Sequence, residues 1–246
     1  MFMKIKLVIE YDGVGFSGWQ IQDGERTIQG ELEKVIEKVI GEPITLYASG
    51  RTDAGVSAKA QVAHFETNLI KFNAFSFLGS VNFFLPPEIC VKSAEVVRDD
   101  FDARFTAKRK TYSYKFYISR YNRPLYDRAL RVNDNVSVEK MREACKYLIG
   151  EHDFSSFVAR KSGKTNFVRT IYNACIIDLG DGLYSFEITG NGFLYNMVRI
   201  ISGTIVDVGL GKIALEDIED IINSKDRTRA GKTLPPHGLY LVKVEY

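Results

Sequence analysis

Cysteine and histidine are both scarce in this chain of 246 residues, which contains three of each. The cysteines at positions 90, 145 and 175 are far apart and odd in number, so they do not form a disulfide framework. Because there is no CxxC pair and so little histidine, a thiolate metal site is not expected either. We predict that Cys90, Cys145 and Cys175 are small buried core residues.

Long hydrophobic runs are also missing. Residues 1–9 carry Lys4 and Lys6 inside an alternating pattern, so they lack the continuous apolar stretch of a signal peptide. No run approaches the length that is needed to cross a bilayer. The hydrophobic content of 45% is nevertheless ordinary for a folded protein. These features predict a cytoplasmic protein with one large domain or two modest ones.

The net charge of +2 is small, but the charges are unevenly distributed. Nine basic residues against one acid, Asp127, fall between positions 104 and 131: Arg104, Lys108, Arg109, Lys110, Lys115, Arg120, Arg123, Arg128 and Arg131. Two smaller basic clusters comprise Arg160, Lys161, Lys164 and Arg169, and Lys225, Arg227, Arg229 and Lys232. Such clustering is typical of a surface that binds a phosphate backbone, although solvated loops can look the same. Charge alone leaves both interpretations open.

The spacing of apolar residues predicts the same order of elements twice. The first half has expected strands at 5–11, 44–49, 60–67 and 89–97, and expected helices after Thr27 and at 73–83. The second half has expected strands at 112–118, 170–178, 183–189 and 240–246, and expected helices after Ser137, at 193–208 and at 214–223. Each half follows the split β-α-β-β-α-β order. We therefore expect an α+β fold of two ferredoxin-like halves, 1–104 and 105–246, whose antiparallel sheets flank a basic cleft.

Some short motifs resemble known cofactor sites but lack the required context. The glycines of segment 13–18 match GxGxxG, but residues 19–24 separate them from any helix that could receive a pyrophosphate. The segments 163–165 and 231–233 end like a P-loop without its leading glycine. His64 and Glu66 match the HxE of zinc deaminases, but the partner PCxxC is absent. We expect no cofactor and no metal.

The segment 49–56, with the sequence SGRTDAGV, lies between two predicted strands. Asp53 and Gly55 are typical turn residues, so a plain turn is the simplest interpretation. Arg51 stands two positions from Asp53, however, and Gly50 and Gly55 would let a ligand approach the backbone closely. The residues alone therefore leave a turn and a charged site as alternatives.

At this point the chain resembles the tRNA pseudouridine synthases that modify positions 38, 39 and 40. Six blocks in the family's order span nearly the whole chain: 11–20, 50–56, 61–65, 102–114, 192–199 and 235–241. Six ordered blocks are far more specific than any one of them. One departure is Ser57, where the family usually has histidine. If that histidine contacts RNA, Lys59 is a possible replacement.

The resemblance implies an isomerase that breaks the bond from ribose C1′ to uracil N1, turns the base, and joins C1′ to C5. Asp53 would be the catalytic carboxylate, which either attacks C1′ or removes a sugar proton to form a glycal. Arg199 would pair with Asp53 and keep it ionised, and Tyr112 would pack on the extruded base. Further RNA contacts would come from Arg51, Lys108, Arg109 and Lys110. The resemblance also implies a homodimer with tRNA reaching across both subunits.

Other interpretations remain for these residues and for the whole chain. Without the resemblance, Tyr112 is a strand residue that alternates with Tyr114, and Arg199 is a surface residue of a helix. The main alternative function is a non-catalytic double ferredoxin-like RNA-binding protein. Such modules expose RNP aromatic motifs, which this sequence lacks. An NAD-dependent enzyme is less well supported because the glycine motif lacks its helix.

Overall fold

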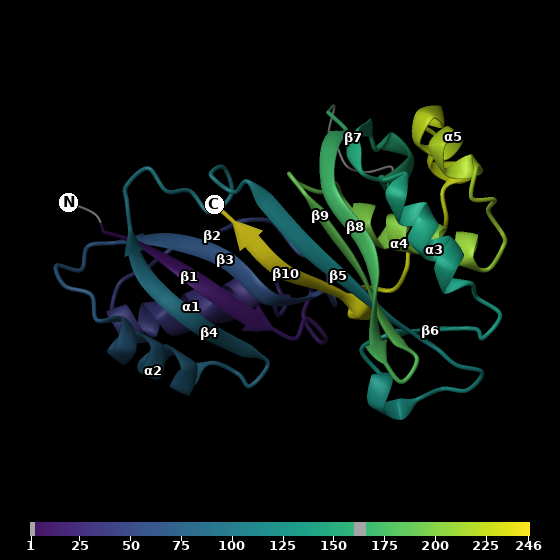
Figure 1. Ribbon diagram of the computed structural model, residues 1–246. Coiled ribbons are helices and arrows are strands. Elements are labelled where there is room, and N and C mark those ends of the chain that lie inside the picture. The colour runs from purple at the N-terminus through teal and green to yellow at the C-terminus, as the bar shows by residue number, and fades with distance from the viewer. Residues whose placement is uncertain (1–2, 160–165) are drawn as a thin grey trace. The chain divides into compact units, whose positions relative to one another are not determined.

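The computed structural model describes residues 3–159 and 166–246, and the basic residues Arg160, Lys161 and Lys164 lie outside these ranges. The chain divides into two compact units (Figure 1). The first consists of Met1–Lys108 together with Tyr240–Tyr246, and the second is Arg109–Leu239. The division expected from the sequence put the boundary after residue 104 and the last strand in the second half. That strand groups with the first unit because its Tyr240 and Leu241 pair with Ser57 and Ala58.

The sheet of the first unit follows the split βαβ order. Its strands are β1 (Met3–Tyr11), β2 (Tyr47–Ala48), β3 (Ser57–Thr67), β4 (Ile89–Val97) and β10 (Leu239–Glu245). Strand β1 pairs antiparallel with β3 on one side and with β4 on the other. Strand β2 is antiparallel to β3, and β10 is parallel to it. Thus β1 and β2 run parallel with β3 between them, as the sequence predicted for this half.

Two helices cover one face of this sheet, α1 (Ile28–Ile40) and α2 (Ala74–Phe84) (Figure 1). Helix α1 begins where the sequence predicted, because the Thr27 side chain accepts a hydrogen bond from the Gly30 amide. It ends at Gly41, whose positive φ of 81° suits glycine. The apolar stripe of α1 is buried, including Ile28, Leu32 and Ile36. The core of this unit lies between that stripe and the inner face of the sheet.

In the part of the chain that the structure describes, the second unit contains the split βαβ arrangement of the first, with two additional short strands and one additional helix. Its strands are β5 (Arg109–Ile118), β6 (Leu130–Val132), β7 (Gly150–Asp153), β8 (Val168–Gly180) and β9 (Leu183–Gly190), and its helices are α3 (Val138–Lys146), α4 (Met197–Gly209) and α5 (Asp217–Ser224). Strand β9 pairs antiparallel with both β5 and β8. Consequently β5, α3 and β8 form a second split βαβ unit. Both units confirm the predicted α+β class, while the basic cleft between the halves stays a prediction.

Three details of the sequence-based expectations were wrong. Helix α4 begins at Met197 rather than near 193, because Asn196 adopts a left-handed conformation with φ of 59°. Cys90 is exposed and Cys175 is half-buried, so Cys145 is the one fully buried cysteine. Cys90 points outward because it alternates along β4 with buried Ile89 and Val91. The short strands β6 and β7 were not anticipated.

None of the helices within residues 3–159 and 166–246 is long and apolar enough to span a membrane. In the same part of the chain, no three His, Cys, Asp or Glu side chains are grouped as metal ligands would be.

Candidate active site

Asp53 lies in the first unit, in the loop that joins β2 to β3, and a second loop fixes the backbone of this segment. The amide of Trp19 donates to the carbonyl of Thr52 at 3.1 Å, and the amide of Gly55 donates to the carbonyl of Phe16 at 3.3 Å. Within the Asp53 loop, the amide of Val56 closes a turn on the Asp53 carbonyl at 3.1 Å. The residue 13–19 loop and the Asp53 loop are thus held together through main-chain hydrogen bonds.

The close packing of these two loops explains the glycines that resemble a dinucleotide motif. A Cβ atom on Gly13 would lie 2.1 Å from the carbonyl oxygen of Val56. A Cβ atom on Gly18 would lie 2.8 Å from the carbonyl oxygen of Thr52, and the φ of Gly18 is +92°. Only glycine allows such an approach between backbones. The motif therefore packs against the Asp53 loop.

Buried polar side chains support the Asp53 loop through hydrogen bonds. The Tyr11 hydroxyl and the Thr52 hydroxyl share a hydrogen bond of 2.8 Å. The amide of the Gln61 side chain donates to the Gly50 carbonyl at 2.8 Å, while its oxygen accepts from the Ser49 hydroxyl at 2.7 Å. Burial raises the pKa of Tyr11 well above its usual range, so its hydroxyl stays protonated and able to donate. These contacts make the loop rigid.

Ser57 also belongs to the hydrogen-bonded side chains that support the Asp53 loop. Its hydroxyl accepts from the Gly13 amide at 3.0 Å and lies 3.4 Å from a carboxylate oxygen of Asp12, to which it donates. Ser57 is 2% exposed, so it faces the protein rather than solvent. Lys59 is exposed two positions further along β3. Its role as a replacement RNA contact stays a prediction.

The loop presents charged side chains of both signs on this fixed backbone. Asp53 is half-buried, and Arg51 is exposed. Asp53 is the one acidic residue in the segment 49–57. A half-buried carboxylate on a backbone held at several points can keep its position during a reaction, as catalysis requires.

Tyr112 lies in the second unit, on β5, and it is 9% exposed. Its ring meets the ring of Phe193 edge-on, with 5.1 Å between the centroids. Phe193 is within the block 192–199, and sequence reasoning did not single it out as a partner of Tyr112. The edge-on contact fixes the plane of the Tyr112 ring.

Arg199 also lies in the second unit, at the start of α4. Every residue of α4 except Arg199 is buried, and Arg199 is half-buried. Its Nε donates to the carbonyl of Leu234 at 2.7 Å, and one Nη donates to the side-chain oxygen of Asn196 at 2.7 Å. Both contacts are to groups of the second unit, so a structural role for Arg199 on the helix stays the alternative to a catalytic one. Asp53 is in the other unit, so its pairing with Arg199 stays a proposal.

The contacts of Arg199 join blocks that are far apart in the sequence. The Tyr114 hydroxyl donates to the Pro235 carbonyl at 2.8 Å, next to the Leu234 carbonyl that Arg199 holds. Burial raises the pKa of Tyr114, and the charge of Arg199 partly offsets that rise. Sequence reasoning did not predict that Leu234 and Pro235 accept these hydrogen bonds, although the block 235–241 had been recognised.

Three of the four expected basic RNA contacts lie at the start of β5 or just before it. Lys108 and Arg109 are exposed, and Lys110 is half-buried. The guanidinium of Arg109 lies 4.7 Å from the centroid of the Tyr172 ring. The amide of Lys108 donates to the carbonyl of Glu245 on β10 at 2.7 Å. Their contact with RNA stays a prediction.

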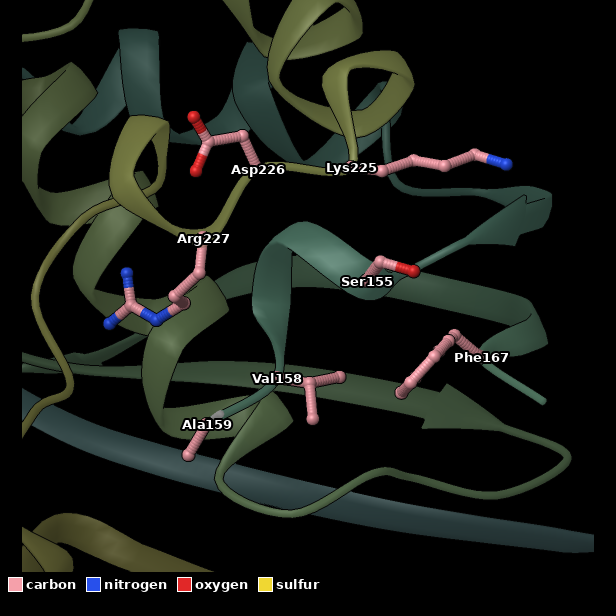
Figure 2. A pocket seen from close by; sticks show the side chains of 7 residues that line it. All are labelled: Ser155, Val158, Ala159, Phe167, Lys225, Asp226 and Arg227. Atoms are coloured by element: carbon pink, nitrogen blue, oxygen red, sulfur yellow. The ribbon is translucent and has the colours of Figure 1, made fainter. Parts of the chain in front are cut away.

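The second unit also contains a hollow of about 270 Å³ (Figure 2). It is lined by Ser155, Val158, Ala159, Phe167, Lys225, Asp226 and Arg227. None of the predicted site residues lines it, and its walls come from the segment 155–159, Phe167 and the segment 225–227 after α5. It is therefore not part of the candidate active site.

Comparisons with known proteins bear on the identity of the chain. A family model described as tRNA pseudouridine synthase matches residues 144–246. The tRNA pseudouridine synthase A of Caldicellulosiruptor bescii is 48% identical, over 99% of this chain and 99% of that protein. Proteins of the same name from Thermoanaerobacter sp. (strain X514) and Bacillus subtilis (strain 168) are each 45% identical with the same coverage. The resemblance is confirmed, and the chain belongs to the tRNA pseudouridine synthase A family.

Proposed function

We propose that this protein isomerises uridine to pseudouridine at positions 38, 39 and 40 in the anticodon stem-loop of tRNA, with Asp53 as the catalytic carboxylate. The observation that carries the proposal is the Asp53 loop, whose backbone is fixed by the residue 13–19 loop through hydrogen bonds at Thr52 and Gly55. The full-length relatives are named as synthases, so a non-catalytic RNA-binding role is not supported.

The reaction needs one carboxylate and no co-reactant. Breaking the bond from C1′ to N1 develops positive charge on the sugar, as glycoside hydrolysis does. Asp53 stabilises that charge by attacking C1′, or it removes the C2′ proton to give a glycal. The uracil then turns and C5 bonds to C1′, which breaks the bond from Asp53 to C1′ in the first route or is accompanied by return of the proton from Asp53 to C2′ in the second. The C5 proton leaves as N1 gains one, so product and substrate have the same atoms. A second carboxylate that activated water would instead release the base.

Asp53 must stay ionised while substrate excludes water from it. A nearby guanidinium lowers the pKa of a carboxyl group, and we propose that Arg199 supplies it. The two hydrogen bonds of Arg199, to Leu234 and to Asn196, support this role because they orient the side chain in advance. Arginine suits the task because it remains charged at every working pH.

The target base must leave the stacked anticodon arm to reach Asp53. We propose that the ring of Tyr112 replaces the lost stacking, with Phe193 holding its orientation. Arg51 is placed two positions from Asp53 and would contact the extruded nucleotide. Lys108, Arg109 and Lys110 would bind phosphates, which position RNA without reading its sequence.

We propose that the protein acts as a cytoplasmic homodimer, with one tRNA in contact with both subunits. Helix α2 supports the dimer, because Phe75 and Phe83 are 90% and 80% exposed. The helix contains no charged residue across Ala74–Phe84, so a phosphate backbone is a poor partner for this face. A second copy of the same uncharged helix would complement it. In sedimentation experiments, the Phe83→Glu substitution should shift the dimer towards monomer, and an unchanged dimer would remove α2 from the contact.

The decisive test compares Asp53→Asn with the native protein on tRNA that carries tritium at uridine C5. The native protein should release tritium without added cofactor, and the variant should release none while binding tRNA equally well. Asn keeps the shape of the side chain but cannot attack C1′ or accept a proton. Tritium release by Asp53→Asn near the native rate would remove Asp53 from the mechanism.

A further inference from the structure

A short turn between β4 and β5, residues 101–106 of the first unit, presents Arg104 and Phe105 to solvent. A carboxylate oxygen of Asp102 accepts the amides of Arg104 at 2.7 Å and Phe105 at 2.8 Å. The Thr106 hydroxyl donates to the Asp102 carbonyl. Although burial alone would raise the pKa of Asp102, the amide hydrogen bonds from Phe105 and Arg104 to its carboxylate lower the pKa overall, so the group stays charged and keeps the turn closed. The turn is thus locally well defined.

Three strands of the first unit hold this turn in place. The buried Ala103 donates its amide to Nδ1 of His64 on β3 at 3.1 Å. Its carbonyl accepts from the hydroxyl of Tyr246, just after β10, at 2.8 Å. From β1, the ammonium of Lys4 donates to the carbonyls of Asp99 at 2.8 Å and Phe101 at 2.9 Å. The turn is therefore a loop fixed on a rigid scaffold, the setting in which binding residues are often found.

The anchored turn displays an aromatic ring and a guanidinium together. Phe105 is 81% exposed, and the Arg104 guanidinium lies 5.4 Å from the centroid of its ring. The exposed acids nearest in sequence are Asp99 and Asp100, and Arg98 pairs with Asp100 at 2.6 Å. Because Phe105 is so exposed, it does not contribute to the hydrophobic core. An exposed ring beside a cation, however, is the combination that stacks on unpaired bases while it attracts phosphate.

The turn is far from the catalytic loop. The Asp53 loop enters β3 at Ser57, whereas the turn is attached to β3 at His64, seven positions later. At the usual rise of a strand, the two attachment points are about 23 Å apart. Phe105 therefore does not touch a nucleotide whose sugar is bound at Asp53.

We propose that the turn of Arg104 and Phe105 is a second RNA contact, in which Phe105 stacks on an unpaired base of the tRNA away from the nucleotide that is modified. This inference rests on the proposed function, since it assumes that tRNA is the substrate. Arg104 binds the phosphate next to the stacked base. Because the contact is remote from the reacting atoms, it strengthens binding of substrate and transition state equally.

Binding of full-length tRNA by the Asp53→Asn variant, at several salt concentrations, tests the contact without turnover. Adding Phe105→Ala should weaken binding about 5- to 150-fold, the range for losing one stacked base, with an unchanged salt slope. Adding Arg104→Ala should also weaken binding and reduce the salt slope by about one charge. Phe105→Trp should retain the affinity. Val96→Ala, at an exposed apolar position on β4, serves as the matched control.

In the catalytically active background, Phe105→Ala should raise KM and leave kcat unchanged. Unchanged affinity in both Phe105→Ala and Arg104→Ala would overturn the proposal. A variant that binds tRNA normally but changes its sedimentation would also overturn it, in favour of a protein contact. If the native protein made no pseudouridine but Phe105→Ala still weakened tRNA binding, the proposed reaction would fail and this contact would stand.

Discussion

Helices α2 and α4 are equivalent in the two compact units, because α2 follows β3 and α4 follows β9, yet they differ in what they bury. Helix α2 buries Phe77 and Val81 and leaves two other phenylalanines almost fully exposed. Helix α4 buries every residue except Arg199. The same topology therefore supports an outward-facing apolar helix in one unit and a central helix in the other. The central helix is the one that presents a charged side chain proposed for catalysis.

The largest difference between the helices should appear at their glycines. A Cβ atom on Gly203 of α4 would lie 1.9 Å from the carbonyl oxygen of Lys232. Gly203→Ala should therefore cost at least about 3 kcal/mol of folding free energy, because backbone must move. Urea unfolding followed by circular dichroism measures this. A loss below about 1 kcal/mol would mean that segment 231–234 moves away from α4 easily.

Truncation of an apolar side chain to alanine should cost much more folding free energy in α4 than in α2. Ile201→Ala on α4 removes a fully buried side chain and should cost about 3 kcal/mol. Phe75→Ala on α2 should change the free energy of unfolding by less than about 0.5 kcal/mol. Both are measured at protein concentrations too low for self-association. A similar cost at the two positions would contradict the contrast in burial.

Arg199→Gln tests whether the one half-buried residue of α4 serves catalysis. We expect turnover to fall about 100-fold, which corresponds to about 2.7 kcal/mol, with little change in tRNA affinity. Glutamine keeps some hydrogen bonding but has no charge to hold Asp53 ionised. Tritium release and filter binding measure the two properties. Loss of binding with unchanged turnover would instead make Arg199 an RNA contact.

The smallest effect is expected at Gly79 of α2. A Cβ atom there would have no neighbour within 4 Å. Gly79→Ala should therefore stabilise the protein by about 0.5–1 kcal/mol, because alanine loses less conformational freedom than glycine in a helix. Thermal unfolding of the variant beside Gly203→Ala gives the matched comparison. If Gly79→Ala lowered the unfolding temperature instead, this face of α2 would be in contact with another molecule in solution.

Local patterns predicted most of the elements of the fold. Helix α1 and strand β4 begin and end where residue spacing placed them, because the cap at Thr27 and the prolines before β4 act locally. The start of α4 could not be predicted, since the left-handed turn at Asn196 interrupts an apolar run that suits a helix. The attachment of β10 to β3 depends on pairing between residues 183 positions apart, Tyr240 with Ser57 and Leu241 with Ala58.

The candidate site was predictable from the family resemblance rather than from local physics. Asp53 alone is a turn residue, and nothing near it in the sequence indicates which loop supports it. The need for glycine at positions 13 and 18 is visible only in the structure, where the carbonyl oxygens of Val56 and Thr52 leave no room for a Cβ atom. Likewise, the hydrogen bond from Arg199 to Leu234 joins residues that no periodic pattern relates.

The pairing of β10 with β3 also has a consequence for synthesis. The ribosome makes the first 108 residues early, but the strand that completes their sheet emerges after the entire second unit. Until then, the end of β3 at Ser57 and Ala58 lacks its partner strand on one side, and Ala103 lacks the hydroxyl of Tyr246. The sheet of the first unit therefore stays incomplete until β10 has been synthesised. An open sheet edge can pair wrongly with a strand of a neighbouring chain.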